Sequence, residues 1–433
     1  MKVTGIIAEY NPFHNGHAYH LKEARRRLES DYVIVVMSGN YVQRGAPTIL
    51  DKYSRAQMAL SCGADLVLEL PSCFATASAE YFAYGGVSIL NKLNVVDALC
   101  FGTETLDSKK NLNDDEDGKA CDYTEDAQDG LANDFMTIAK LLNDEPEDYT
   151  EIFKTAMKDG ASYAAARSKA IAETIGQRYA DITDTSNNIL AVEYLRAILK
   201  LKSKIEIEPI PRMLASHHNT MITEGFSSAT AIRNAIFNKY DFNSIAATVP
   251  KEAFDILMDA YLVTFPIFRD DFSVLVGEKL LVAENADEYS KYFGINQDLA
   301  NRLFKLRNDF VSFSQFRELV STKNSNKATV SRAMMHLALG TTKDDMERFL
   351  KQEEIKAVKV LGFRKEAEPL LSEIKKKADI QLVTKLADYK PEKPEEDMII
   401  ATTKADMLYR LVARYKYNTE LVKTPYEEEI IKL

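Results

Sequence analysis

The chain has 433 residues, of which 46% are apolar and 28% are charged, and its formal net charge is −10. This length allows two or three domains with separate cores, and no stretch reaches the roughly 18 uninterrupted apolar residues of a membrane helix. We therefore expect a soluble, cytoplasmic protein without a membrane partner or a stable protein partner.

The negative charge comes from one segment. Residues 105–148 contain fourteen Asp and Glu against four Lys, which accounts for the whole net charge. We predict an acidic insertion here, with a mobile first part at the surface and no chemistry of its own. Because the remainder is neutral overall, its charge does not exclude a nucleic-acid partner. The four cysteines, which lack paired metal-binding spacing, are predicted to be free thiols: Cys62, Cys73, Cys100 and Cys121.

The first hundred residues alternate between strand and helix patterns. Apolar runs predict strands at 3–10, 31–40, 64–71 and 97–104, and the stretches between them predict helices at 18–29, 53–61 and 79–93. This alternation is typical of a parallel sheet covered by helices on both faces, as in Rossmann-like α/β folds. Ligands bind such sheets beyond the carboxyl ends of the strands, where the turn after the first strand falls.

Helices are expected next within 149–176 and at 186–201, a further strand at 205–212 and another helix from 227. After about residue 249 the pattern is mostly helical. We therefore expect an α/β domain over 1–245, with the acidic insertion at about 105–148, and a mostly α-helical domain over 246–433.

The turn between the first strand and helix carries three of the six histidines. A helix start offers unpaired amides and the positive end of the helix dipole to an anion. His14 and His17 could flank one phosphate there and donate to it as imidazolium groups, while Gly16 allows close approach and Pro12 fixes the entry of the turn. Helix capping and metal binding are the alternatives. The second is weakened because no Cys, Asp or Glu follows at ligand spacing, so we predict no metal site on the protein.

A second helix start, Ser227–Arg233, has the sequence SSATAIR. Its hydroxyl groups and amides could hold phosphates, with Arg233 neutralising them, although a capped surface helix would fit this stretch alone. Together the two motifs resemble the HxGH and SSTxIR signatures of the nucleotidylyltransferase superfamily, with one extra residue in the second. This resemblance implies a Rossmann-like nucleotidylyltransferase domain.

Longer stretches resemble the bacterial tRNA(Met) cytidine acetate ligase family. They cover most of the first 245 residues and continue near the end of the chain: EYNPFHNGH, MSGNYVQRGAPTILDK, GADLVLELP, SAEYFAYGGVSILNKL, FGTE, GASYAAAR, SNNILAVEYL, SSATAIR, VLGFRKEAEPLLSEIKKK and LVTKLADY. The resemblance implies that ATP and acetate form acetyladenylate, whose acetyl group passes to N4 of the wobble cytidine of elongator tRNA(Met), giving N4-acetylcytidine. No covalent enzyme intermediate is needed.

The resemblance also implies which residues act. His14, His17 and Arg233 would be catalytic, with Mg²⁺ bridging the phosphates of ATP. The ATP contacts would be Ile7, Ala8, Glu9, Tyr10, Asn11, Pro12, Phe13, His14, Asn15, Gly16, His17, His20, Gly102, Asn187 or Asn188, Arg212, Ser228, Thr230 and Arg233. Gln43, Arg44 and Lys52 form a polar island that could meet phosphate or RNA, or could be an ordinary surface loop.

Two departures from the family concern the acidic segment, which is longer than expected, and the tRNA contacts. The family tends to carry a basic, aromatic stretch like TKRYTYTR, whereas residues 322–332 read TKNSNKATVSR. The remaining candidates for tRNA binding could equally be solvated surface residues: Lys323, Lys327, Arg332, Arg364 and Lys375 to Lys377.

Two other functions remain open. A small-molecule adenylyltransferase or ligase could use the same nucleotide site without any RNA, and a catalytically inactive protein could bind tRNA without releasing pyrophosphate. The presence of both signatures speaks against the inactive protein.

Overall fold

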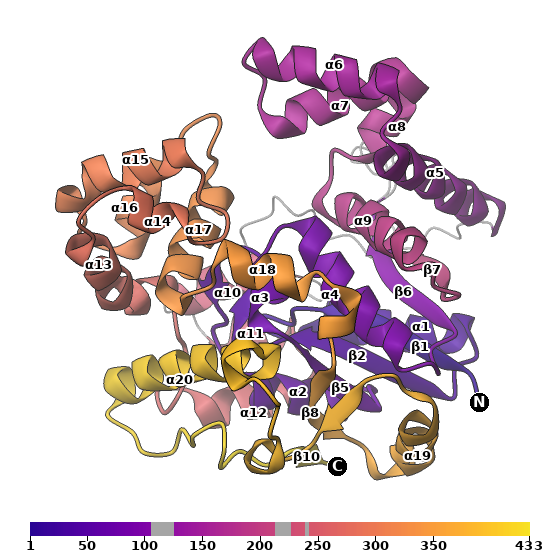
Figure 1. The fold of residues 1–433 in the computed structure, drawn as a ribbon. Coiled ribbons are helices and arrows are strands. Elements are labelled where there is room, and N and C mark those ends of the chain that lie inside the picture. Colours follow the sequence, from indigo (N-terminus) through magenta and orange to yellow (C-terminus); the bar gives the residue numbers. More distant parts are fainter. Residues whose placement is uncertain (105–124, 213–226, 239–241) are drawn as a thin grey trace.

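A computed structural model describes residues 1–104, 125–212, 227–238 and 242–433 (Figure 1). The predicted mobile first part of the acidic insertion, and Cys121 within it, lie outside the described residues. Cys62, Cys73 and Cys100 are free thiols, as predicted. Among the described residues, no helix combines the length and apolar character needed to cross a membrane.

The central sheet is mostly parallel and confirms the predicted Rossmann-like α/β architecture. Its order is β10-β8-β5-β2-β1-β6-β7, with β9 paired to β8. The parallel strands are β1 (Val3–Ala8), β2 (Tyr32–Ser38), β5 (Leu66–Leu70), β6 (Ala98–Thr103) and β7 (Glu206–Pro211). A short hairpin, β3 (Tyr41–Val42) and β4 (Ala46–Pro47), follows β2.

Three strands from the C-terminal part extend this sheet, and the sequence patterns did not predict them. They are β8 (Ala357–Phe363), which runs antiparallel to β5, and β9 (Gln381–Val383) and β10 (Ile431–Lys432), which are parallel to β8. The family resemblance included VLGF, but a short strand flanked by helical patterns has no periodicity to reveal it.

Helices cover both faces of the sheet because β2 is apolar on both sides. Ile34 and Val36 join one core with helices α4 (Ala79–Lys92), α5 (Glu125–Asp144) and α9 (Ser186–Leu201). Val33 and Val35 point the other way, into a core with α1 (Asn15–Arg27) and α2 (Lys52–Ser61). This alternation follows from the two-residue repeat of a strand.

The second half of the predicted acidic insertion is a packed helix. Phe135 and Ile138 of α5 are fully buried in the core that α9 shares. The acidic composition of 105–148 did not reveal this helix, because its apolar residues are few and are recognised only by their helical spacing. Helices α6 (Glu147–Lys158), α7 (Tyr163–Ile175) and α8 (Gln177–Ile182) follow it.

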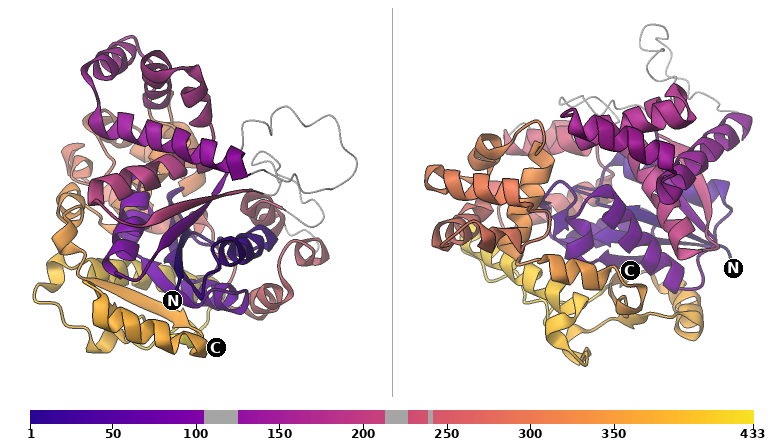
Figure 2. Two further views of the ribbon diagram at one scale, coloured as in Figure 1. Left: turned by 90° about the vertical axis from the view of Figure 1, so that its right-hand side faces the viewer. Right: turned by 45° about the horizontal axis from the view of Figure 1, so that its top comes forward.

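The C-terminal part is mostly helical, as predicted. Helices α13 to α17, residues 273–339, form a lobe to one side of the sheet, which we call the helical lobe (Figures 1 and 2). Its core also includes Tyr41 of β3 and Tyr409 of α20. The remaining helices, on both sides of residue 245, are α3 (Ser72–Ala75), α10 (Ala229–Phe237), α11 (Phe242–Ala246), α12 (Lys251–Ala260), α13 (Ser273–Val282), α14 (Asp287–Ser290), α15 (Gln297–Leu306), α16 (Phe313–Val320), α17 (Lys327–Leu339), α18 (Lys343–Phe349), α19 (Glu368–Lys377) and α20 (Met398–Tyr417).

A buried ion cluster joins α20 to the sheet. Lys52 Nζ lies 2.7 Å from both carboxylate oxygens of Glu69 on β5 and also contacts Asp406 of α20. Asn40 donates to Asp406 at 2.9 Å. Lys52 is 2% exposed, so the suggestion that it meets phosphate or RNA is not supported by its position.

A second lysine, Lys359 of β8, lies buried near this cluster without a hydrogen bond. Its ammonium group stands 5.4 Å from the ring centre of Tyr53. Burial, aided by the charge of Lys52, lowers the pKa of Lys359 to about 8. We expect Lys359→Met to raise the free energy of unfolding at neutral pH by about 1–2 kcal/mol, because it removes a buried charge without a hydrogen-bond partner.

The pH dependence of stability provides the check. An unfolded lysine has a pKa of about 10.4, so above pH 8 the unfolded chain binds more protons than the folded one and wild-type stability rises with pH. The variant should lose this contribution. Urea denaturation of both proteins at pH 7, 8 and 9 measures the free energy of unfolding at each pH. If this free energy changes with pH equally in both proteins, the lowered pKa is not that of Lys359.

Candidate active site

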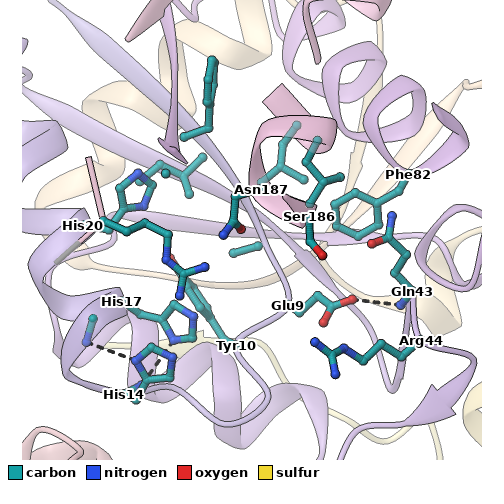
Figure 3. Close-up of a pocket in the computed structure, with 18 of the residues that line it drawn as sticks. Glu9, Tyr10, His14, His17, His20, Gln43, Arg44, Phe82, Ser186 and Asn187 are labelled. Atoms are coloured by element: carbon teal, nitrogen blue, oxygen red, sulfur yellow. Dashed lines mark hydrogen bonds between the residues drawn. The ribbon is translucent and has the colours of Figure 1, made fainter. Parts of the chain in front are cut away.

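A cavity of about 620 Å³ lies at the carboxyl ends of β1, β6 and β7 and extends to the helical lobe (Figure 3). Its position agrees with the crevice expected for a Rossmann-like sheet. Many residues predicted to bind ATP or tRNA line it: Ile7, Ala8, Glu9, Tyr10, His14, Gly16, His17, His20, Gly102, Asn187, Arg212, Lys327 and Arg332.

Other predicted contacts stand behind the cavity wall and hold the turn after β1. The Asn11 side chain accepts a hydrogen bond from the Ile49 backbone at 2.9 Å, and Phe13 is fully buried. Pro12 follows a cis peptide bond. The Asn15 side chain donates to the Ala247 carbonyl at 3.1 Å. These residues shape the site from outside the cavity.

Most of the SSATAIR motif also lies outside the cavity lining, where its side chains hold neighbouring backbone and side chains in place. The Ser228 hydroxyl accepts from the Ala231 backbone at 3.1 Å, and the Thr230 hydroxyl accepts from Arg233 at 3.0 Å. Arg233 donates in addition to the Asn11 carbonyl at 2.7 Å, so it joins the two motifs. Burial lowers the pKa of Arg233 to about 10, which leaves it charged at neutral pH. Both hydroxyls accept from groups of α10, and only the neighbouring Ser227 lines the cavity, so the phosphate contacts of Ser228 and Thr230 stay predictions.

The asparagine pair divides its roles. Asn188 is buried and makes two hydrogen bonds with the Glu104 backbone, at 2.9 and 2.8 Å, which fix the end of β6. Asn187 faces the cavity and donates to the Glu104 carboxylate at 2.5 Å. Of the two alternatives, the geometry favours Asn187 as the ligand contact. Gly102 packs closely against Arg212. A side chain at position 102 would place its Cβ only 3.1 Å from Cγ of Arg212.

The two motif histidines stack on one another at the start of α1, with ring centres 3.6 Å apart and planes inclined by 24°. His14 Nδ1 accepts from the Gly16 amide at 3.1 Å, and His17 Nδ1 accepts from the His14 amide at 3.3 Å. The Asn15 amide donates to the Thr248 carbonyl at 3.0 Å. The expectation of unpaired amides was wrong for these three groups, because the capping interactions use them.

This capping determines what the rings can offer a ligand. A neutral imidazole that accepts through Nδ1 carries its proton on Nε2. Burial, followed by the charges of His14 and Arg212, lowers the pKa of His17 well below its usual range. The expected imidazolium is therefore replaced at His17 by a neutral ring with an Nε2–H donor. His20, on the same side of the cavity as His14 and His17 in Figure 3, has its pKa lowered to about 4 by burial.

Arg55, which the sequence analysis missed, holds the strand ends that form the site. It is fully buried and donates to the carbonyls of Glu9 at 2.7 Å and Ser38 at 3.0 Å, and to that of Gly39. Beside it, Tyr10 has a positive φ of 47°, which turns the chain sharply after Glu9. An arginine among the apolar residues of the predicted 53–61 helix was the available signal, since a buried arginine needs acceptors.

Basic residues of the C-terminal part face the same cavity. Arg317 of α16, Lys327 and Arg332 of α17, and Arg269 line it together with Arg44 of the β3–β4 hairpin. We call these five residues the basic wall. Arg269 and Arg317 were missed because isolated arginines in helical patterns are usually solvated.

The other tRNA candidates lie elsewhere. Lys323 is exposed in the segment before α17 and does not line the cavity. Arg364 follows β8 and lies near Met1 and Asp31, at the opposite edge of the sheet. Lys376 and Lys377 form ion pairs with Glu373 on α19. Of the residues predicted to bind tRNA, only Lys327 and Arg332 line the cavity.

Comparisons with known proteins agree with this geometry. A family model described as HIGH Nucleotidyl Transferase matches residues 1–118 and 121–424. A tRNA(Met) cytidine acetate ligase of Acetivibrio thermocellus is 38% identical over 90% of this chain and 89% of its own. Another, from Caldanaerobacter subterraneus subsp. tengcongensis, is 34% identical over the full length of both.

Two crystal structures of Thermotoga maritima TmcAL are also similar. The apo form superposes with a TM-score of 0.87 at 29% identity and covers both chains completely. The form bound with alpha-thio ATP has a TM-score of 0.80 at 31% identity and covers 95% of each chain.

Proposed function

The chain belongs to the tRNA(Met) cytidine acetate ligase family, and from this premise we propose that it activates acetate with ATP and acetylates tRNA. The intermediate is acetyladenylate, and the acceptor is N4 of the wobble cytidine of elongator tRNA(Met). The observation that carries the proposal is that the histidine pair and the basic wall line one cavity. A nucleotide and an RNA strand can therefore meet there.

In the first step, an acetate oxygen attacks the α-phosphorus of ATP in line with the departing pyrophosphate. The Nε2–H groups of His14 and His17 donate to the phosphate as negative charge accumulates, and the N-terminal dipole of α1 acts in the same direction. Arg233 keeps the turn in place through the Asn11 carbonyl. Gly102 and Arg212 at the ends of β6 and β7 and Asn187 at the start of α9 line the cavity, where they would border the nucleotide.

We propose that Mg²⁺ enters as the ATP complex. Among the described residues there is no group of three His, Cys, Asp or Glu side chains that could hold a metal ion. Mg²⁺ commonly retains several waters and binds through substrate phosphates, so this donor set suits an ion carried by the nucleotide. When bound, the ion neutralises phosphate charge.

The two parts of the chain would divide the work. Residues 1–245 would activate acetate, whereas 246–433 would hold tRNA through the four residues that it contributes to the basic wall; Arg44 would be added from the first part. Lys327 is exposed at the start of α17, where it pairs with Glu318 at 2.5 Å, and Arg332 lies one turn farther along the same helix. Their charges can contact the phosphates on either side of the acceptor nucleotide.

We expect Lys327→Ala to raise the KM for tRNA by about 3- to 10-fold. The slope of log KM against log salt concentration should fall by about one, as for the loss of one phosphate contact. Lys305→Ala is the matched control, because Lys305 is exposed on α15 and does not line the cavity. Kinetics at several salt concentrations measure both. Equal salt slopes for wild type and Lys327→Ala would remove Lys327 from the interface.

The test of the whole proposal is transfer of radiolabelled acetate to purified elongator tRNA(Met) with ATP and Mg²⁺. Other tRNAs and a transcript without the wobble cytidine are the controls. Label confined to the tRNA with that cytidine supports the ligase. Pyrophosphate without labelled RNA would favour a small-molecule enzyme, and tRNA binding without pyrophosphate would favour an inactive binding protein.

A further inference from the structure

One end of the cavity has polar groups that a triphosphate does not explain. Glu9 and Gln43 line it together with Phe82, and Figure 3 shows these side chains at the end opposite His20. Glu9 Oε1 accepts from the Gln43 backbone amide at 2.9 Å, which orients the carboxylate and leaves Oε2 available. The carbonyl of Glu9 is held by Arg55.

The side-chain amide of Gln43 is the second observation. Its Nε2 is buried and has no hydrogen-bond partner among the described residues. A buried N–H donor without an acceptor is unfavourable, and in a binding site it indicates an acceptor supplied by a ligand. The backbone carbonyl of Gln43 lies 3.5 Å from Nη1 of Arg332, so the same residue also contacts the basic wall.

A carboxylate beside an amide donor does not suit the phosphates of ATP, because Glu9 would repel them. The pair is instead complementary to one edge of a pyrimidine. Cytosine offers an N4 amino donor next to the N3 and O2 acceptors, and carboxylates accept from that amino group. Uracil has an acceptor at position 4 and a donor at N3, so it would meet both groups with the wrong polarity.

We propose that Glu9 and Gln43 read the Watson–Crick edge of the acceptor cytidine. Glu9 accepts from N4–H, Gln43 Nε2 donates to N3 or O2, and the base lies along the wall formed by Phe82. A base that leaves its stack to react is commonly recognised by such edge contacts. This inference rests on the proposed function, since it assigns the residues that select its acceptor.

The arrangement places Glu9 where the transfer step releases a proton. The N4 lone pair attacks the acetyl carbon, the new N–C bond forms, and the bond between that carbon and the phosphate oxygen breaks. AMP leaves with the bonding electron pair. The N4 proton passes to the Glu9 carboxylate and then to solvent, so that Glu9 acts as a general base as well as a specificity contact.

The experiment compares both half-reactions in Gln43→Met, which keeps the length of the side chain and removes its donor. Acetate-dependent pyrophosphate exchange measures adenylate formation, and single-turnover transfer from preformed labelled acetyladenylate to tRNA(Met) measures the second step. We expect transfer to fall about 10- to 100-fold more than exchange does, the effect of losing one good base contact. Gln43→Glu, which presents a charge to N3 and O2, should fall further.

Gln57→Met is the matched control, because Gln57 lies on α2 away from the cavity and should retain both rates. Thermal melting identifies any variant that fails to fold. Equal loss in both half-reactions, or Gln43→Glu transferring better than Gln43→Met, would overturn the inference while leaving the ligase intact. A wild-type protein that labels no tRNA would instead overturn the proposed function.

Discussion

Replacing His17 by alanine is expected to slow acetyladenylate formation by about 10²- to 10³-fold, the size seen when one donor to a developing oxyanion is removed. The physical reason is the Nε2–H group, which the capping hydrogen bond to His17 Nδ1 directs away from the backbone. Acetate-dependent pyrophosphate release measures the effect. A near-normal rate would remove His17 from the mechanism.

Glutamine is the matched replacement, because its side-chain amide retains an N–H donor and can still accept from the His14 backbone. His17→Gln should therefore be faster than His17→Ala. Because the pKa of His17 is lowered well below its usual range, the ring remains neutral across pH 6–8. A rate that falls as pH rises through about 6.5 in the wild type, but not in His17→Gln, would show that the imidazolium acts instead.

Lys52→Met is expected to lower the free energy of unfolding by about 3–5 kcal/mol, as for a buried ion pair that loses one partner. Lys52 neutralises two carboxylates, Glu69 and Asp406, which are 2% and 4% exposed. Without the ammonium group, both remain buried with no bonded cation in the described structure. Urea denaturation at neutral pH measures the loss.

The control is Lys22→Met, which changes an exposed lysine of α1 and should alter stability by less than about 0.5 kcal/mol. Lowering the pH should narrow the difference between Lys52→Met and the wild type, because burial raises the pKa of Glu69 and protonation removes its need for a counter-charge. If the difference stays constant down to about pH 4, near the ordinary carboxylate pKa, the destabilisation comes from lost packing.

The first motif lies at the junction of β1 and α1, and both of its histidines line the cavity. The apolar run at 3–10 followed by His14 and His17 could be read directly, since the periodicity of both elements is local. Composition alone did not predict that Phe135 is buried. Its segment is acidic overall, yet a few apolar residues at helical spacing pack one face of the helix into the core.

Patterns within about twenty residues are enough to predict the parallel α/β sheet, the helical C-terminal part and the two nucleotide motifs. Which motif side chains reach the cavity depends instead on how distant segments pack together. Asn188 has the chemistry of a ligand contact, but its side chain is bonded to the backbone of Glu104, 84 residues away. Lys52 and Arg332 look alike in the sequence, whereas one is buried between carboxylates and the other lines the cavity. The burial of Lys52 depends on Asp406, which is 354 residues away, and no local pattern records such a partner.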